Sequence, residues 1–558
     1  MRAAPPARPT ADVFRPPILS LAYCGLWSFA THELYYYGQS GWEWGTLAAF
    51  VTGGMALGQL AKAMNDNFKV KAHRRKKKRF DAGKGEHGQA RWATAEDIQD
   101  SKILTDKQGI FIGTIESGKR SYRDVLYEGP YSISVFAPPG SLKSMGIVAS
   151  TLFGNVGDGG VIVNDPSGEM YCICGPTLAK SGVDVQVISP FANKLEALIG
   201  GKVRDVGLDV FSSLRTSIDP YSIRGDLQKV AKWVIPGRPH MDEKSEFFYR
   251  GARMQFSFLS MKEIVEGRHP TLSALRYHLM KGPGGLDELF MDAEGSSAFH
   301  GVYAELARSL SGVLHTASQQ FAGSYGVLEQ HLDPFDHASS MGVHTEQSSW
   351  DPRVLKNPHK KTVVFVIYTL EMLEAYSQAL AMTMSYLFDT IAADNQQGNV
   401  TALLDEASSL RMDLASKLDR YRKTGLRVAM FWQDMAQAEF NHGKTGFRRI
   451  MSASRLKIGM NLQEPEMLNL FSKMCGTRSI TKLQLSDRAM MTSPMPDLSP
   501  NLNHEGVPLM RPEEIRMMPE DELLVVGDNL HPMRLQKLPW WKRPEWKAMA
   551  GPSPYYKD

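Results

Sequence analysis

The sequence predicts an α/β protein that contains a parallel sheet, an all-helical insertion and an N-terminal pair of membrane-spanning helices. Three observations predict this fold class. Short apolar stretches alternate with helical ones after residue 80, the strand pattern stops between 221 and about 335, and two long apolar segments precede residue 64. Alternating strands and helices are typical of a parallel sheet covered on both faces. At 558 residues the chain is also too long for one hydrophobic core, so several domains are expected.

Composition excludes several classes of protein. Hydrophobic residues make up 43% of the chain and charged residues 22%, which excludes a disordered chain and a carrier whose mass lies mainly in the bilayer. The four cysteines are too scattered for a disulfide framework, and they lack the paired spacing of a zinc site, so a reducing compartment is expected. The net charge of +4 is small, so any anionic partner must be argued from local basic residues.

The two apolar segments at 17–37 and 44–63 each approach the roughly 20 residues that a transmembrane helix needs. Tyrosines and tryptophans cluster around the short turn between them, as at a membrane interface, and a basic run at 69–79 follows the second segment. Further arginines precede the first segment, so both ends of this hairpin are expected in the cytoplasm. We interpret the basic run as a topology and lipid-headgroup signal. Polar residues within the segments leave two buried core helices as the alternative.

Seven stretches are the expected strands of the sheet. They are 131–136, 160–164, 184–188, 362–368, 400–404, 426–432 and 455–460. Several are continuous apolar runs, as central parallel strands are. From 221 to about 335 the pattern is helical, which indicates a helical insertion in an α/β domain.

The segment 137–144, APPGSLKS, lies between an expected strand and an expected helix. A phosphate-binding loop needs that setting, because backbone N–H groups and the helix N-terminus face the anion while a lysine reaches the terminal phosphates. Lys143 and Ser144 match the end of G-x-x-x-x-G-K-[ST], but Ala137 and Leu142 replace its glycines. If position 142 requires a positive φ, leucine costs roughly 1 to 2 kcal/mol there. The candidate phosphate-binding residues are Gly140, Ser141, Leu142, Lys143 and Ser144. Alone, the segment fits an incidental Lys-Ser after a strand equally well.

Two further polar positions follow expected strands. Asp405 and Glu406 end the stretch VTALLDE, where the first carboxylate can hold Mg²⁺ and the second can polarise an attacking water. Gln433 follows the next strand, where a polar side chain can sense a γ-phosphate. Open α/β sheets bind ligands at the carboxyl ends of their strands, so these three elements are expected to form one site.

With these motifs in order, the chain resembles the type IV coupling proteins, the TraG-like ATPases of conjugal transfer, over nearly its whole length. The resemblance also rests on segments elsewhere in the chain. These are HGQARWAT at 87–94, DPSGEMY at 165–171, LLDEASSL at 403–410, FWQDMAQ at 431–437, MCGTRSI at 474–480 and the closing segment at 511–541.

This resemblance implies a RecA-like P-loop motor domain with an inserted all-α domain, tethered to the bacterial inner membrane and assembled as a ring, expected to be a homo-hexamer. ATP would bind between subunits. Lys143 and Ser144 would contact phosphate and Mg²⁺, Asp405 would support the metal, Glu406 would be the catalytic base, and Gln433 would read the nucleotide state. An arginine finger from a neighbouring subunit is expected, and the sequence does not rank Arg448, Arg449 and Arg455 for that role.

The resemblance also implies domain boundaries. We expect the membrane hairpin and basic flank at 1–80, the nucleotide-binding domain at 81–220 and 336–558 with a C-terminal tail, and the substrate-recognition insertion at 221–335. The chain departs from the family pattern at three positions: Pro139 replaces a threonine and removes one N–H, Leu142 replaces a glycine, and Ser167 replaces a lysine. Gly140 would offset the change at 142 if the tight turn shifts by two residues.

Three functions are therefore open. The first is an ATPase that delivers relaxase-bound single-stranded DNA, protein effectors or both to a type IV secretion channel. The second is a nonhydrolysing membrane receptor of the same fold, which the changes at Pro139 and Leu142 favour. The third is a membrane-attached DNA motor for chromosome segregation, which accounts less well for the helical insertion and the closing segment.

Overall fold

A computed structural model describes residues 51, 53–62, 64, 88–118, 121–154, 159–212, 214, 218–237, 241–485 and 500–555. The chain divides into two compact units, one of Met1–Ala90 with Gly476–Pro508 and one of Arg91–Cys475 with Leu509–Asp558. The first expected membrane segment, 17–37, and the basic run at 69–79 lie outside the described residues. Of the second segment, residues 51 and 53–62 are described and are helical. In the described ranges, no helix is both long and apolar enough to span a bilayer.

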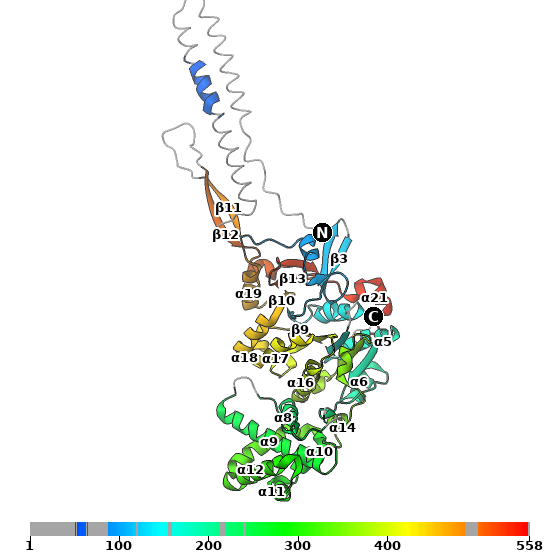
Figure 1. Cartoon of the computed structure of the whole chain (residues 1–558). Helices are drawn as coiled ribbons and strands as arrows, with labels where there is room; N and C mark the ends of the chain where they lie inside the picture. The colour runs from blue at the N-terminus through cyan, green and yellow to red at the C-terminus, as the bar shows by residue number, and fades with distance from the viewer. Residues whose placement is uncertain are drawn as a thin grey trace, which may run out of the picture. The chain divides into compact units, whose positions relative to one another are not determined.

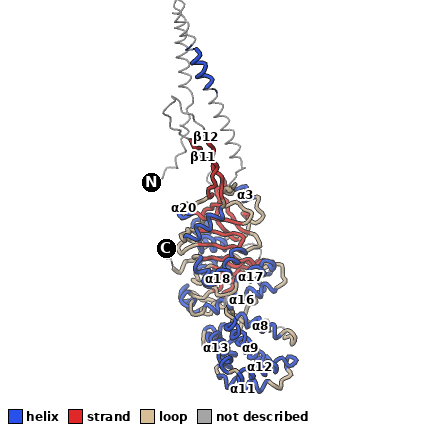
Figure 2. Tube along the Cα trace, turned by 90° about the vertical axis from the view of Figure 1, so that its left-hand side faces the viewer, coloured by secondary structure: helices blue, strands red, loops and turns tan. Residues whose placement is uncertain are grey.

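The larger unit is built on a 12-stranded mixed sheet, whose strands are red in Figure 2. Its order is β1-β3-β2-β14-β13-β10-β4-β9-β8-β5-β7-β6. Seven neighbouring strands are parallel: β4 (Ser132–Phe136), β5 (Gly159–Asn164), β6 (Asp184–Ile188), β7 (Thr362–Val366), β8 (Asn399–Leu404), β9 (Leu426–Trp432) and β10 (Ser454–Gly459). These are the seven expected strands, each within two residues of its predicted bounds. Every residue of β4, β5 and β7 is buried, as expected for strands covered on both faces.

Five antiparallel strands extend the sheet beyond β10 and correct the expectation of a purely parallel sheet. They are β1 (Leu104–Thr105), β2 (Ile110–Gly118), β3 (Ser121–Tyr127), β13 (Glu522–Gly527) and β14 (Met533–Gln536). The C-terminal segment thus inserts β13 and β14 between β10 and the N-terminal β2, so chain segments about 400 residues apart form one sheet.

Helices alternate with the parallel strands (Figure 1). They are η2 (Ser144–Val148), α4 (Ala149–Phe153), α5 (Glu169–Lys180), α6 (Ala192–Ile199), α16 (Ser377–Ala393), α17 (Leu414–Tyr421), α18 (Met435–Ala453) and α19 (Pro465–Cys475). Shorter helices are α3 (Ala95–Gln99), η5 (Pro352–Lys356), α15 (Leu370–Leu373), η6 (Ala407–Ser409), η7 (Arg422–Thr424), α20 (Pro512–Arg516), η8 (Trp540–Lys542) and α21 (Pro544–Met549).

Between β6 and β7 lies the helical region, drawn in green in Figure 1. It comprises α8 (Ile223–Val234), α9 (Glu243–Val265), α10 (Leu272–Leu279), α11 (Gly282–Ala293), η3 (Ala298–Gly301), α12 (Val302–Thr316), α13 (Ser318–Leu332), η4 (Asp333–Phe335) and α14 (Ser340–Glu346). Aromatic side chains form its core, since the ring of Phe258 lies 4.8 Å from that of Phe290 and 5.1 Å from that of Tyr303. The predicted helical insertion is present here as a helical region, while the three predicted domain boundaries stay predictions.

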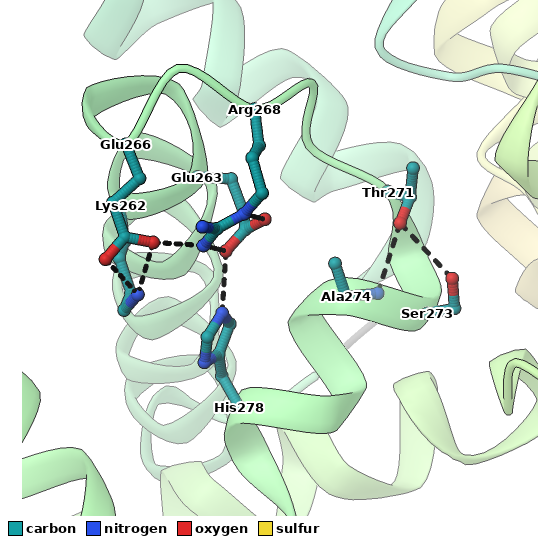
Figure 3. A network of polar contacts seen from close by, with 8 residues as sticks. All are labelled: Lys262, Glu263, Glu266, Arg268, Thr271, Ser273, Ala274 and His278. Carbon is teal, nitrogen blue, oxygen red and sulfur yellow. Dashed lines mark hydrogen bonds and ion pairs between the residues drawn. The ribbon is translucent and has the colours of Figure 1, made fainter.

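A polar network joins the end of α9 to α10 (Figure 3). The buried carboxylate of Glu263 accepts two hydrogen bonds of 2.7 Å from the Arg268 guanidinium, and His278 Nε2 lies 2.6 Å from its Oε1. Burial alone would raise the pKa of Glu263, but the hydrogen bonds from Arg268 and His278 outweigh it and hold the pKa at about 2. The Glu263 carboxylate is therefore charged at neutral pH in the folded helical region, and its charge stabilises the fold.

The two chain segments that connect the helical region to the sheet are held together. We call these two segments, residues 205–209 and 344–349, the neck. At its sheet end, Val206 N–H donates to Val187 O of β6 (3.0 Å). Leu208 N–H donates to His344 O (2.8 Å), and Ser349 N–H donates to Val206 O (2.9 Å). Asp205 accepts a hydrogen bond from the His344 ring as well. Gly207 has φ +70°, and a Cβ there would lie 2.1 Å from Gln347 O, so the close approach of the two segments requires glycine.

The smaller unit contains an antiparallel pair, β11 (Thr477–Leu485) and β12 (Pro500–Pro508). Gln89 forms a bridge with Arg478, and Ala90 N–H donates to Thr477 O at 3.0 Å. The chain around residue 90 therefore pairs with the start of β11.

Candidate functional site

The candidate phosphate loop follows β4 directly. Ala137 N–H donates to Trp432 O of β9 (2.9 Å), after which the chain turns and enters η2 and α4, so the expected strand–loop–helix arrangement is confirmed. Gly140 and Leu142 both have left-handed backbones, with φ of +77° and +65°. Gly140 therefore adds a second left-handed residue and does not replace the one at 142, contrary to our hypothesis of a shifted turn. Leu142 stands in a conformation that leucine disfavours.

Several N–H groups of this loop have no hydrogen-bond acceptor. Within the described residues, no acceptor is bonded to the N–H groups of Gly140, Leu142 or Lys143. Ser141 N–H donates weakly to Pro138 O (3.2 Å), and Pro139 has no N–H. Free, adjacent N–H groups at the start of a helix are the donors that anion-binding loops use.

The predicted polar residues meet at the carboxyl edge of the sheet. Ser144 Oγ lies 2.7 and 2.6 Å from the two carboxylate oxygens of Asp405, to which it donates. Lys143 Nζ lies 3.5 Å from Glu406 Oε2, and Gln433 Nε2 donates to the same oxygen at 2.9 Å. Residues from three parts of the chain therefore form one polar cluster, as the order of the motifs predicts.

Burial sets the electrostatics of this cluster. Asp405 is buried, and burial raises its pKa to about 6, although Lys143 and the Ser144 hydroxyl favour the charged form. Glu406 is held on its other oxygen by Ser408 Oγ, so its position is fixed by three side chains. Because burial deprives Asp405 of hydration, a cation bound beside it would stabilise the charged form of this carboxylate.

Asp165 is a site residue that we had not selected. It follows β5 as Asp405 follows β8, and both carboxylates are buried. Burial raises the pKa of Asp165 to about 7, the Tyr171 N–H opposes this, and the charge of Asp405 raises it further. Ser167, in place of the family's lysine, donates to Asp165 at 3.1 Å. An acidic residue after a buried strand is the signal that finds Asp405, and it also finds Asp165.

Lys537 lies behind the loop. Its ammonium donates to Asn461 Oδ1 (2.7 Å) and lies 3.4 Å from Ser141 O, while burial lowers its pKa to about 8. Three residues later, the indole N–H of Trp540 reaches Met145 Sδ at 3.3 Å. The closing segment 511–541 contains Lys537, but nothing in the sequence indicates that this lysine contacts the loop, which lies 394 positions away at Lys143.

The donor atoms present fit a Mg²⁺–nucleotide pair. Mg²⁺ takes oxygen ligands and is usually held by one or two carboxylates together with substrate phosphates, and Ser144 and Asp405 supply a hydroxyl and a carboxylate in contact. Asn164, the last residue of β5, is fully buried, and its side-chain amide has no hydrogen-bond partner in the described structure. An unpartnered buried amide at this edge is typical of a place completed by a polar ligand or water.

The three arginines named as finger candidates differ in position. Arg448 and Arg449 lie on α18 and are exposed, and Arg449 lies 3.6 Å from Asp419. Arg455 is the second residue of β10, at the amino end of the strand, where its guanidinium lies 5.3 Å from the Tyr131 ring. Within one chain, Arg455 therefore belongs to the sheet edge opposite Lys143.

Comparison of the sequence with known proteins identifies a family that matches this chain. Residues 85–556 match the model of a family described as type IV secretory system conjugative DNA transfer. The chain is 23% identical over 555 residues to the conjugal transfer protein TraG of Agrobacterium fabrum (strain C58 / ATCC 33970), covering 92% of this chain and 78% of that protein.

Two solved structures have the same fold. One is the plasmid coupling protein TrwB in complex with the non-hydrolysable ATP analogue ADPNP (TM-score 0.57, 17% identity, 81% of this chain and 93% of that chain). The other is TrwB in complex with ADP and Mg²⁺ (TM-score 0.53, 17% identity, 74% of this chain and 85% of that chain). Because the family model spans most of the sequence, including every motif of the site, the chain belongs to the type IV secretion coupling protein family of conjugative DNA transfer.

Proposed function

We propose that this protein is an ATP-driven coupling protein that delivers relaxase-bound single-stranded DNA, protein effectors or both to a type IV secretion channel. One observation carries the proposal: at the carboxyl edge of the sheet, Ser144 donates to Asp405, and Lys143 and Gln433 both contact the neighbouring Glu406. Family membership supports the secretion role, and the TrwB structures with ADPNP and with ADP and Mg²⁺ support the binding of a nucleotide with Mg²⁺.

The loop residues bind the nucleotide in this proposal. The N–H groups of Gly140, Leu142 and Lys143 and the Lys143 ammonium would hold the phosphates, with Ser141 in the same turn. Ser144 and Asp405 would hold Mg²⁺, which neutralises phosphate charge and orients the phosphates when bound.

Glu406 is the proposed general base. Its Oε2 accepts from Gln433 and lies beside Lys143, while Oε1 accepts from Ser408, so one carboxylate is in contact with the loop lysine and with the residue after β9. Glu406 would take a proton from an attacking water. Gln433 would report phosphate occupancy to β9. Its amide donates to Glu406, so a movement of Glu406 on nucleotide binding would break this hydrogen bond.

We further propose that the chain works as a homo-hexameric ring anchored in the bacterial inner membrane by two N-terminal helices, with both chain ends and most of the chain in the cytoplasm. A neighbouring subunit would supply the arginine finger. The helical region would recognise relaxase, accessory proteins or effectors. These proposals follow from the sequence and from family membership.

A nonhydrolysing receptor is the second candidate. Leu142 at φ +65° and Pro139, which lacks an N–H, favour it, because both make the loop a poorer phosphate cradle than the family pattern. Such a receptor would bind secretion substrates while another ATPase supplies energy.

Two substitutions separate nucleotide binding from hydrolysis. Lys143→Ala should weaken ATP binding and turnover together, since it removes a cation from the phosphates. Glu406→Gln should leave binding intact and lower turnover by roughly 10² to 10⁴-fold, because an amide cannot take the proton. Lys360→Ala is the matched control, since this exposed lysine pairs with Asp184 away from the loop.

The measurements are ATP affinity and steady-state ATPase rate of the full-length protein, with and without single-stranded DNA and secretion partners. If the wild-type protein binds ATP without turnover under all these conditions, the receptor is correct. If Lys143→Ala binds and hydrolyses ATP like Lys360→Ala, segment 137–144 is not a phosphate loop.

A further inference from the structure

A polar cavity of ≈650 Å³ opens at the sheet edge opposite the candidate ATP site. It is lined by residues that precede β4, β8 and β9, including Pro130, Gly398 and Gly425, whereas Ser144, Asp405 and Gln433 follow the same strands. A six-residue strand such as β8 is about 20 Å long, so the two places are separate. The volume lies within the range of about 300–1,000 Å³ that is usual for small-molecule sites.

The lining of this cavity carries an excess of positive charge. Four basic residues contribute to it, Lys356, Arg422, Lys423 and Arg427, against the two acidic residues Glu128 and Asp394. Both carboxylates have neutral partners: Glu128 accepts from the Gln108 amide, and Asp394 accepts from the backbone and side chain of Gln396 at 3.1 and 3.0 Å. Among the described residues, neither carboxylate lies within ion-pair distance of a basic side chain, although Lys356 donates to the backbone oxygen of Asp394. The lining therefore keeps two more basic than acidic residues.

Among the basic residues that line the cavity, Arg427 gives the strongest indication of an anionic ligand. It is half-buried, and its Nε donates to the neutral hydroxyl of Thr401 at 2.7 Å. Burial lowers the pKa of Arg427, while Tyr127 and Glu128 act in the opposite direction. Within the described part of the chain, Arg427 has no carboxylate in ion-pair contact. A half-buried cation with no carboxylate in contact is costly, so its place at a cavity wall indicates an anionic ligand.

Arg422 is held in place on the same wall. It is exposed, and its guanidinium lies 4.3 Å from the centre of the Tyr131 ring, in cation–π contact. The contact orients the guanidinium and uses none of its N–H donors, which remain available for paired hydrogen bonds to phosphate oxygens.

We propose that this cavity is a second anion site, which binds phosphate groups of a nucleotide-sized ligand or of a nucleic-acid backbone through Arg422, Lys423 and Arg427. The site is distinct from the loop at Lys143 and does not depend on ATP hydrolysis there. Both sources present the same chemistry, closely spaced phosphate oxygens, and the experiment distinguishes them.

Inorganic tripolyphosphate is the probe, titrated calorimetrically into full-length protein. Because the Lys143 loop is expected to bind the same probe, the measurement is made in a Lys143→Ala background, where one site per chain should remain. Arg422→Gln and Arg427→Gln should each weaken that site about tenfold or more, since each removes a charge-assisted hydrogen-bond donor. Arg427→Lys should recover part of the loss.

Arg420→Gln is the matched control. This exposed arginine lies two residues from Arg422 and does not line the cavity, so its loss of charge is equal and should change affinity less than roughly twofold. If Arg427→Gln fails to fold, the exposed Arg422 decides the result alone. Absence of tripolyphosphate binding in the Lys143→Ala background, or equal losses for Arg420→Gln and Arg422→Gln, overturns the proposal.

An oligothymidylate distinguishes the ligand sources. If it displaces tripolyphosphate, and Arg422→Gln weakens it in parallel, the cavity takes the DNA backbone. If tripolyphosphate binds and the oligonucleotide does not compete, the ligand is a free polyphosphate or nucleotide. If Lys143→Ala leaves the wild-type number of sites unchanged, the loop assignment fails while the cavity result still stands.

Discussion

Replacing Leu142 by glycine should stabilise the protein relative to replacing it by alanine, the reverse of the usual order. Leu142 has φ +65° and is 38% exposed. A Cβ in this conformation costs about 1–2 kcal/mol. Glycine costs about 0.5–1 kcal/mol more backbone entropy than alanine does. The difference predicts that Leu142→Gly is more stable than Leu142→Ala by about 0–1.5 kcal/mol.

Comparing the two variants with each other cancels the loss of the leucine side chain, which both share. The measurement is the urea midpoint of each full-length variant, followed by tryptophan fluorescence, with ATP affinity measured on the same samples. If Leu142→Gly proves less stable than Leu142→Ala by about 0.5–1 kcal/mol, the normal penalty for glycine, position 142 is not left-handed in solution and the strain at the loop does not exist.

The remaining predictions concern acid stability, the lysine behind the loop and nucleic acid. The Glu263 carboxylate, with a pKa of about 2 against an ordinary 4.5, contributes on the order of 3 kcal/mol above pH 4.5, and this is lost as the pH falls toward 2. Urea midpoints should therefore fall more steeply between pH 5 and 3 for wild type than for Glu263→Gln, and parallel curves would contradict the network with Arg268. Lys537→Met leaves the oxygens of Ser141 and Asn461 without their donor, so we expect a loss of about 1–3 kcal/mol in stability and weaker ATP binding. Lys537→Arg should recover part of both losses. Unchanged ATP affinity in Lys537→Met would contradict the role of this lysine behind the loop. Binding of nucleic acid should be indifferent to sequence and weaken with salt, which a titration with single-stranded and duplex DNA measures; strong sequence selectivity would exclude a channel that grips phosphates.

Several of the parallel strands could be predicted because they are buried on both faces and therefore read as nearly continuous apolar runs. β7, TVVFV, and β9, LRVAMFW, need no alternation to be recognised. Two antiparallel strands could not, since β3, SYRDVLY, and β14, MRLQ, mix charged and apolar residues over a few positions, whereas β13, ELLVVG, carries the same apolar signal as the parallel strands. One of the two strands that pair with β14 is β2, which is far away in the sequence, and a local sequence pattern cannot indicate such a pairing.

The candidate site was partly predictable for the same physical reason. Asp405 and Gln433 stand directly after recognisable strands, and the carboxyl ends of parallel strands meet at one edge. The left-handed backbone at Leu142 followed from the phosphate-loop pattern, which has glycine at that position. Lys537 and the unpartnered amide of Asn164 depend on how distant segments pack, so only the structure reveals them.

The neck at 205–209 and 344–349 bears on how coupling proteins could change their cargo. It gathers the incoming and outgoing chain of the helical region at β6, which is the outermost strand of the sheet, so residues beyond it can be exchanged without altering the spacing of inner strands. Insertions are tolerated best where both ends lie close together at a surface. If the helical region recognises substrates as proposed, a chimera joined at Gly207 and Gln347 should keep the backbone hydrogen bonds of the junction and transfer specificity as a block.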